Sequence, residues 1–471
     1  MGNGVLGIEA GFRVEGLVFR TVRMKRVGFS LLGVVVLGGS ALCAQGVAPL
    51  PMAPGAAVTT LSPQPGTWSE PSVAVNPRNP KQVVAVYQFV AQAAYSSDAG
   101  ETWKAASGVA APNYRMSGDV STVFDNRGHA LICYIAFDKL GTTNYWGHGA
   151  TRNGIYVRRS LDGGATWEPE LRTVAAQPST PGVPFEDKPY LVADAGSRSP
   201  YAGNLYVGWT RWTLTDSQML FSRSTDDGLT WSKPMEIAQE RGLPRDDNGA
   251  LEGFDGAVGP DGTLYAVWAL TDHIIFTESH DGGRTFKRTK EIVRTAPTMF
   301  AMEGLERANG FPQIAIDPRD GRRGGPIYVT WSDYRNGDVD VFCIVSKDHG
   351  RSWSRPVRVN DDPVHDGADQ FFQWLAVDPV SGAANVAFYD RREDASDKTQ
   401  IVALARSTDG GATFKNYAWT KTPFHADGVF MGDYIGLAAW GNRVYGVWAS
   451  RPGTEKHTTV EAGVADFGPE R

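Results

Sequence analysis

The residues best suited to chemistry in this 471-residue chain gather in short polar loops beside apolar, strand-like segments. Arginine, aspartate, glutamate and tyrosine recur there, and a guanidinium group can bind a carboxylate through two charge-assisted hydrogen bonds. Loops of this composition indicate a binding or catalytic site if the fold brings them to one surface. They include NYRMSGD (113–119), ALEGFD (250–255), SDYRNGDVD (332–340), YDRRED (389–394) and FHADGVFMGDY (424–434).

An octapeptide that occurs six times indicates which elements must position these loops. Its template is S-x-D-x-G-x-[ST]-[WF], and the copies begin at Ser96, Ser160, Ser224, Ser279, Ser346 and Ser407. A period of about 60 residues is typical of a repeat architecture built from one supersecondary unit. The unit around the fifth copy contains PQIAIDP (312–318), GPIYVTWSD (325–333), DVFCIVS (340–346) and WSRPVRV (353–359). Four short β-branched and aromatic segments between turn residues predict one four-stranded antiparallel propeller blade.

The number of blades follows from segments that look like the first strand of a unit. Such segments begin near residues 70, 119, 188, 254, 312, 373 and 433. We therefore predict an all-β fold, a single β-propeller with seven blades, with six as the alternative. The last unit stops one strand short, and AAVTTLS (56–62) could supply the missing strand. Strands from both termini would then close the ring and remove an open sheet edge.

The octapeptide resembles the Asp box, or BNR repeat, of the sialidase superfamily of β-propeller proteins, and the resemblance covers residues 56–471. In that family the motif lies at the turn between the third and fourth strands. Its aspartate can accept backbone hydrogen bonds within the turn, its glycine can adopt a positive φ, and its aromatic residue packs between sheets. The resemblance implies this structural role for Asp98, Asp162, Asp226, Asp281, Asp348 and Asp409. Function is then expected on the opposite face.

A sialidase site, as the resemblance implies, holds the substrate carboxylate with three arginines and uses a tyrosine nucleophile, a glutamate and an aspartate. The residues here that could fill those roles are Arg115, Arg335 and Arg391 for binding, and Asp119, Glu252 and Tyr434 for catalysis. The family's R-I-P motif is absent from GTWSEPSVAV (66–75), which leaves one arginine unassigned. Each of these residues also has a structural alternative. The arginines could form ion pairs within the protein, and Tyr434 could pack in the core. Asp119, Asp187 and Asp433 could cap loop N–H groups.

Three functions remain open from these residues. The first is a sialidase-like glycoside hydrolase acting on glycans, and the second is a non-catalytic propeller that binds a glycan or protein partner. The third is a glycosidase for neutral polysaccharide, which needs two carboxylates across a cleft, such as Asp119 with Asp433 or Glu252. No cofactor is expected, although the run Asp333, Asn336, Asp338 and Asp340 could either bind calcium or serve only as a solvated loop.

The first 46 residues predict a secretory signal peptide. Basic residues precede the apolar run VGFSLLGVVVLGGSALC, and small and polar residues follow it. Met24 would be a more ordinary start for such a signal, and an uncleaved membrane anchor is the alternative. We expect residues 47–471 to form the propeller domain of a secreted or periplasmic monomer. A formal net charge of -6 gives no support to a nucleic-acid partner or to a basic membrane-binding surface.

Overall fold

The repeated unit of the sequence folds into a sheet of four antiparallel strands. The computed structural model describes residues 49–62, 66–88, 90–297, 302–451, 453 and 456–468, and every regular element in them is a strand. The predicted signal segment, 1–46, lies outside the described residues. Within the part of the chain that is described, no helix is long and apolar enough to span a membrane.

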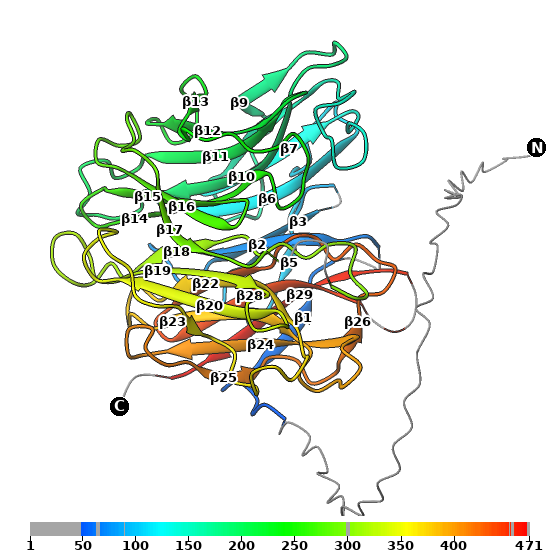
Figure 1. The fold of residues 1–471 in the computed structure, drawn as a ribbon. Coiled ribbons are helices and arrows are strands. Elements are labelled where there is room, and N and C mark those ends of the chain that lie inside the picture. The colour runs from blue at the N-terminus through cyan, green and yellow to red at the C-terminus, as the bar shows by residue number, and fades with distance from the viewer. Residues whose placement is uncertain are drawn as a thin grey trace, which may run out of the picture. The chain divides into compact units, whose positions relative to one another are not determined.

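Seven sheets follow one another along the chain, which confirms the predicted seven-bladed propeller (Figure 1). Blade 1 contains β2 (Ser69–Val75), β3 (Val83–Gln88), β4 (Gln92–Ser96) and β5 (Lys104–Ala105); blade 2 contains β6 (Met116–Phe124), β7 (Ala130–Phe137), β8 (Asn153–Ser160) and β9 (Arg172–Gln177). Blade 3 contains β10 (Phe185–Ala193), β11 (Leu205–Trp212), β12 (Ser217–Ser224) and β13 (Met235–Glu236); blade 4 contains β14 (Leu251–Val258), β15 (Leu264–Leu270), β16 (His273–Ser279) and β17 (Lys290–Arg294). Blade 5 contains β18 (Gln313–Ile316), β19 (Ile327–Asp333), β20 (Asp340–Ser346) and β21 (Val357–Arg358). Blade 6 contains β22 (Gln370–Val377), β23 (Ala384–Asp390), β24 (Thr399–Ser407) and β25 (Lys415–Ala418), with β26 (Phe424–His425) also paired to β24.

The seventh blade takes strands from both ends of the propeller, as predicted. It contains β27 (Gly436–Trp440), β28 (Arg443–Ser450) and β29 (Thr459–Asp466), and β1 (Ala57–Thr60) completes it. β1 pairs antiparallel with β29, from Ala57 opposite Val464 to Thr60 opposite Glu461 (Figure 1). The first strand of each blade contacts the first strand of the next, and β2 contacts β27, so the first strands form a closed ring, and we call the space it surrounds the channel.

Each octapeptide forms the turn after a third strand, and its aspartate bonds within that turn. In blade 2, Asp162 Oδ1 accepts from Ser160 Oγ at 2.8 Å and from the Thr166 backbone N–H at 2.9 Å. Thr166 Oγ1 donates to the other oxygen, Asp162 Oδ2, at 2.7 Å. The aspartates of the other five copies make the same three bonds. Their carboxylates therefore serve the turn rather than a site on the opposite face.

Aromatic residues of the octapeptides pack against the neighbouring blade. The Phe286 ring of blade 4 lies 4.8 Å from the Phe221 ring of blade 3, and Trp353 of blade 5 lies 5.5 Å from Phe276 of blade 4. Such contacts contribute about 0.5–1.5 kcal/mol each beyond their buried area. The repeated turn thus connects adjacent sheets, and it leaves the opposite ends of the blades for other chemistry.

Candidate active site

A β-bulge recurs near the beginning of the first strand in five blades. At each bulge the pairing with the second strand shifts, and the residue that begins the bulge has a positive φ. Bulges bend a strand and redirect its side chains. Four of the five residues at these bulges are not glycine, although their positive φ is a conformation that favours glycine. The five are Glu70 in blade 1, Asp119 in blade 2, Lys188 in blade 3, Gly253 in blade 4 and Phe372 in blade 6. The bulges lie at the end of the channel opposite the octapeptides.

Three carboxyl groups from blades 1, 2 and 3 form one hydrogen-bonded group at this level. The Glu70 and Asp187 side chains both hydrogen-bond to Asp119. Burial and the nearby Asp119 charge raise the pKa of Glu70 and of Asp187 well above the ordinary range. Desolvation opposes ionisation of Asp119 too, but the hydrogen bonds from Asp187 and Glu70 outweigh it and lower its pKa. Of the three carboxyls, Asp119 is thus the one whose ionised form this arrangement favours.

Backbone and side-chain hydrogen bonds from the same blades hold these three carboxyl groups in place. Lys188 N–H donates to Asp119 Oδ2 at 3.0 Å, and Asp119 N–H donates to Gln88 Oε1 at 2.8 Å. The Gln88 amide also donates to Glu70, and the Trp212 indole donates to Asp187 Oδ2 at 2.8 Å. The bulge in one blade is thus bonded to the bulge in the next, which orients the carboxyl groups at the channel.

A second polar group joins the loops that precede blades 4, 5 and 7. Arg307 donates to both oxygens of Asp433, at 2.6 and 2.5 Å, and to Asp246 Oδ2 at 2.5 Å. The Trp146 indole donates to the same Asp246 oxygen at 3.2 Å. The Asp433 backbone N–H donates to Glu70 Oε1 at 3.2 Å, which connects this group to the bulge of blade 1. Arg307 therefore crosses from blade 5 to two buried carboxylates on other blades.

Glu252 lies between these groups and an open pocket. Its side chain is 3% exposed and lies within hydrogen-bond reach of the Asp246 carboxyl. Asp246 Oδ1 and Glu252 Oε2 have no donor partner among the described residues, so a proton held between the two carboxyls is the available way to satisfy them. Burial, and then the nearby Asp246 and Asp187 charges, raise the pKa of Glu252 well above its ordinary value. Burial therefore favours the protonated form of Glu252.

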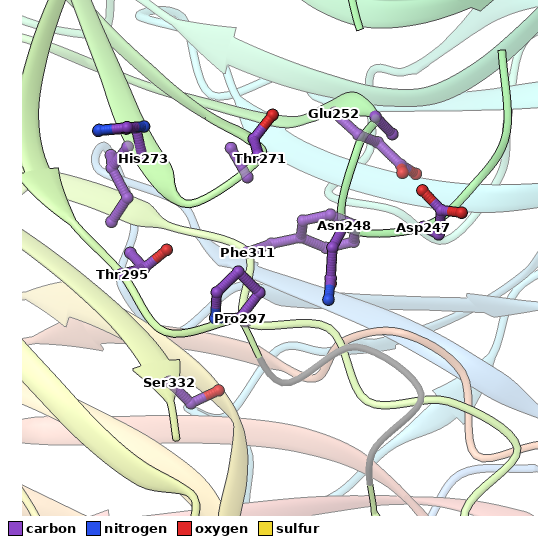
Figure 2. A pocket seen from close by; sticks show the side chains of 13 residues that line it. Asp247, Asn248, Glu252, Thr271, His273, Thr295, Pro297, Phe311 and Ser332 are labelled. Atoms are coloured by element: carbon purple, nitrogen blue, oxygen red, sulfur yellow. The ribbon is translucent and has the colours of Figure 1, made fainter. Parts of the chain in front are cut away.

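The pocket beside Glu252, which we call the outer pocket, lies between blades 4 and 5 and has a volume of about 470 Å³ including space open to solvent (Figure 2). In Figure 2 the Glu252 and Asp247 carboxyl groups lie on one side of the pocket, and His273 and Thr295 lie on the other. Asn248, Thr271 and Ser332 add an amide and two hydroxyls, and Phe311 adds an aromatic surface. Among the described residues that line it, none is an arginine or a lysine.

The predicted catalytic residues all lie at the bulge end of the channel. Asp119 belongs to the three-carboxyl group, and Glu252 lines the outer pocket. The Tyr434 hydroxyl donates to the Val120 carbonyl at 3.3 Å, and its ring lies 5.6 Å from the Trp374 ring. Burial and the nearby Glu70 and Asp119 charges raise the pKa of Tyr434 well above 10.0, so its phenol stays protonated. A glutamate does not accept this phenol proton; a backbone carbonyl does.

The three predicted arginines, by contrast, do not converge. Arg335 pairs with Asp333 at 2.5 Å, next to it on blade 5. Arg391 is fully buried and donates to the Glu303 and Asp397 carbonyls at 3.0 and 2.8 Å. Arg115 is exposed on blade 2, and its backbone N–H donates to Asp138 Oδ1 at 3.3 Å. The three arginines thus bond to separate groups of the protein and do not form one carboxylate-binding triad.

The side chains of the run considered for calcium contact other protein groups. Asp333 pairs with Arg335, Asn336 Nδ2 donates to Asp340 Oδ2 at 2.5 Å, and Asp338 Oδ2 accepts from the Gly367 N–H at 2.9 Å. Within the described ranges, no group of three or more His, Cys, Asp or Glu side chains is arranged to hold a metal ion.

Several site residues were missed from the sequence alone: Glu70, Lys188, Asp246, Asp247 and Arg307. A usable signal existed for two of them, because Glu70 and Lys188 occupy the same first-strand position as Asp119 when the five bulged blades are aligned. Asp246 and Asp247 lie in RDDNG, which has the composition of an ordinary turn. Arg307 offered no signal, because its partners lie 61 and 126 residues away.

Comparisons with known proteins agree with this fold. No family model and no curated protein matches the chain. Among solved structures, a polysaccharide lyase described as an ulvan lyase is similar at a TM-score of 0.50 and 11% identity, over 84% of this chain and 93% of the lyase. A Penicillium chrysogenum α-L-arabinanase has a TM-score of 0.46 at 14% identity, and the match covers 89% of this chain and 97% of the arabinanase. A Hadza microbial sialidase has a TM-score of 0.47 at 17% identity, and the match covers 82% of this chain and 73% of the sialidase. At 11% identity the likeness to the lyase shows a similar fold alone.

Proposed function

We propose that this chain is a secreted glycoside hydrolase that cleaves neutral glycans in the outer pocket. The observation that carries the proposal is Glu252, a buried carboxyl in the wall of an open pocket, where burial raises its pKa well above the ordinary value. A carboxylic acid with a raised pKa can protonate the leaving oxygen of a glycosidic bond. Secretion rests on the signal-like residues 1–46.

Asp247 is the second carboxylate that this reaction requires. It lines the same pocket, is half-exposed, and accepts a backbone hydrogen bond from Gly249 at 2.9 Å through Oδ1. In the proposed reaction Glu252 gives its proton to the glycosidic oxygen as the bond to the sugar carbon breaks. Asp247 assists attack at that carbon, either by taking a proton from water or by bonding to the carbon directly.

A neutral glycan fits the pocket better than a sialoside. Sialic acid carries a carboxylate, and arginine pairs are the usual means of binding such a group. The described lining of the outer pocket includes His273 but no arginine or lysine, and the three predicted arginines are engaged elsewhere. The amide and hydroxyl side chains of the pocket suit sugar hydroxyls, which both donate and accept hydrogen bonds.

The test is hydrolysis by the purified full chain. Neutral p-nitrophenyl glycosides of glucose, xylose, arabinose and galactose form one panel, and a 4-methylumbelliferyl sialoside forms the other. We expect release from the neutral panel and a loss of at least about 100-fold in kcat for Glu252→Gln. Glu461→Gln is the matched control, because Glu461 is a partly buried acid whose pKa is also raised, but it lies on β29. Release from the sialoside alone would contradict the proposal, and binding without release from either panel would indicate a non-catalytic glycan-binding propeller.

A further inference from the structure

The sixth position of the repeated octapeptide distinguishes two neighbouring blades from the others. It is arginine in blades 4 and 5, as Arg284 and Arg351, and it is glutamate, alanine or leucine in the other four copies. The segments RTFKRTK (284–290) and HGRSWSRPVR (349–358) contain further lysine and arginine residues and no acidic residue. Because the whole chain has a net charge of -6, this basic character is local.

The basic segments of blades 4 and 5 lie side by side. The Lys290 ammonium donates to the Gly350 carbonyl at 3.4 Å, and Gly350 directly precedes Arg351. Phe276 is opposite Lys290 in the pairing of β16 with β17, and its ring lies 5.5 Å from that of Trp353. We call the shared surface the basic seam, and its exposed cationic residues are Arg284, Arg288, Lys290, Lys347, Arg351 and Arg355.

The positive charge of the basic seam is not neutralised within the described part of the chain. None of its six side chains forms an ion pair with a described residue, whereas the neighbouring Lys287 pairs with Glu278 at 2.7 Å. Asp348, the acid closest in sequence, accepts hydrogen bonds within its own turn instead, from Ser346 Oγ at 2.9 Å and the Ser352 N–H at 2.8 Å. The cations are therefore available to a ligand from outside.

The basic seam is an open surface, and none of its six residues lines the outer pocket. β16 separates the two sites, since His273 at its first position lines the outer pocket and Ser279 at its last position begins the octapeptide of blade 4. A strand of this length spans roughly 20 Å. Six charges spread over two blades suit an extended polyanion rather than a small enclosed ligand.

The side chains of the basic seam select among polyanions. Binding to a lipid surface uses apolar side chains that enter the bilayer, and none of the exposed large apolar residues in the described ranges lies in the seam. Single-stranded nucleic acid stacks its bases on aromatic rings, but Phe286 and Trp353 of these turns pack against the preceding blade. Four of the six cations are arginines, which bind carboxylates through paired hydrogen bonds.

We propose that the basic seam binds an acidic polysaccharide, a polymer in which carboxylates project from successive sugar rings. Arg284 and Arg351, at the same position of neighbouring turns, bind carboxylates on different rings of one polymer chain. The other four cations strengthen the attraction. Binding holds the propeller on the polymer and leaves the outer pocket open at the other end of β16. This inference goes beyond the proposed hydrolysis and does not depend on it.

The experiment measures the affinity of the purified full chain for polygalacturonate and for alginate by isothermal titration calorimetry. We expect binding to at least one of them that weakens at least about tenfold between about 20 and about 200 mM sodium chloride, because salt screens exposed charges. The methyl ester of polygalacturonate, which lacks the charges, should not bind comparably. The inference would be overturned if neither acid bound at the lower salt concentration or if the ester bound equally well. Tighter binding to double-stranded DNA or to phosphatidylglycerol vesicles would also overturn it.

Two variants with the same change in net charge locate the binding surface. The seam variant combines Arg284→Gln, Arg288→Gln, Arg351→Gln and Arg355→Gln, and the control combines Lys104→Gln, Lys139→Gln, Lys233→Gln and Lys421→Gln at exposed positions of other blades. We expect the seam variant to lose affinity for the polymer at least about tenfold and the control less than about twofold. Equal losses would mean that only the overall charge matters, and no loss in the seam variant would place binding elsewhere, so either result would overturn the inference.

Hydrolysis provides a separate readout. Both variants should retain the wild-type kcat/KM on the best neutral glycoside within about twofold, since the outer pocket is untouched. If the wild type hydrolyses no glycoside, the proposed function fails while the binding comparison still tests the basic seam. If the fourfold seam variant does not fold, the pair Arg284→Gln and Arg351→Gln is compared with Lys104→Gln and Lys233→Gln, with the same outcomes.

Discussion

Arg307 and Asp433 form a two-bonded ion pair, Nε to Oδ1 at 2.6 Å and Nη2 to Oδ2 at 2.5 Å, between loops 126 residues apart. The guanidinium is 15% exposed and its third bond goes to Asp246, so one side chain compensates two buried carboxylates. The bonds hold the loop before blade 5 against the loops before blades 4 and 7. Arg307 thereby positions Asp246, and through it the hydrogen-bonded Glu252.

Replacing Arg307 with Gln should destabilise the propeller strongly, because Asp246 and Asp433 would stay buried without their cation. Breaking a buried ion pair from one side costs about 3–5 kcal/mol, which urea denaturation can measure. Arg294→Gln is the matched control, since that arginine is 77% exposed in its pair with Asp272 and should cost less than about 1 kcal/mol. Equal losses in the two variants would show that the bridge contributes little.

Asp255→Asn should reduce the dependence of stability on pH. Burial raises the pKa of Asp255 to about 7, and its oxygens accept from the Ile314 and Gly256 backbone N–H groups at 2.8 and 2.7 Å. Because the folded-state pKa is raised, stability is fully present below about pH 4 and falls as the pH rises through about 7. The free energy of unfolding would fall by about 4 kcal/mol over this range, because each unit by which the folded-state pKa is raised corresponds to roughly 1.4 kcal/mol.

The measurement for Asp255 is the unfolding free energy of both proteins at intervals from pH 4 to pH 8. We expect the wild type to lose stability over this range more steeply than the variant, whose amide does not ionise. Parallel curves would mean that Asp255 does not titrate differently in the folded protein.

Arg335→Ala should lower stability but leave hydrolysis nearly unchanged. Arg335 pairs with the fully buried Asp333 at 2.5 Å, so its removal should lower the free energy of unfolding by about 3 kcal/mol. Hydrolysis should be unaffected because Arg335 does not line the outer pocket. We expect kcat/KM on the best neutral glycoside to stay within about twofold, measured below the unfolding temperature of the variant. A loss above about tenfold would favour a substrate carboxylate held by arginine.

Asp162→Ala should affect stability alone, since its carboxylate accepts three hydrogen bonds within its own turn. By analogy with helix caps, the loss should be about 1–2 kcal/mol in urea denaturation, with unchanged hydrolysis. Leu161→Ala is the matched control, because this exposed residue occupies a variable position of the same turn. If the two variants were equally stable, the repeated aspartate would lack the structural role predicted for it.

Part of the candidate site was predictable from the sequence. The sequence places Asp119 and Glu252 beside first strands, and both lie at the bulge end of the channel. It places the three arginines in loops of the same face, but a local acid engages one of them: Asp333, two residues before Arg335, accepts from its guanidinium. Sequence-neighbouring ion pairs of this kind form wherever the backbone brings the charges together, without reference to a ligand.

The sequence by itself determined the blade, its repetition, the count of seven, the closure by β1 and β29, and the face on which the octapeptide turns lie. These features follow from local hydrogen bonding and from side-chain alternation, which repeat along the chain and can be recognised there. Only the tertiary structure decided that Arg307 meets Asp246 and Asp433, that Glu70 and Asp187 meet Asp119, and that the Lys188 ammonium lies over the Tyr434 ring. Those meetings depend on the bulges and on the closed ring, which bring residues from separate blades within bonding distance and exclude the water that would otherwise separate their charges.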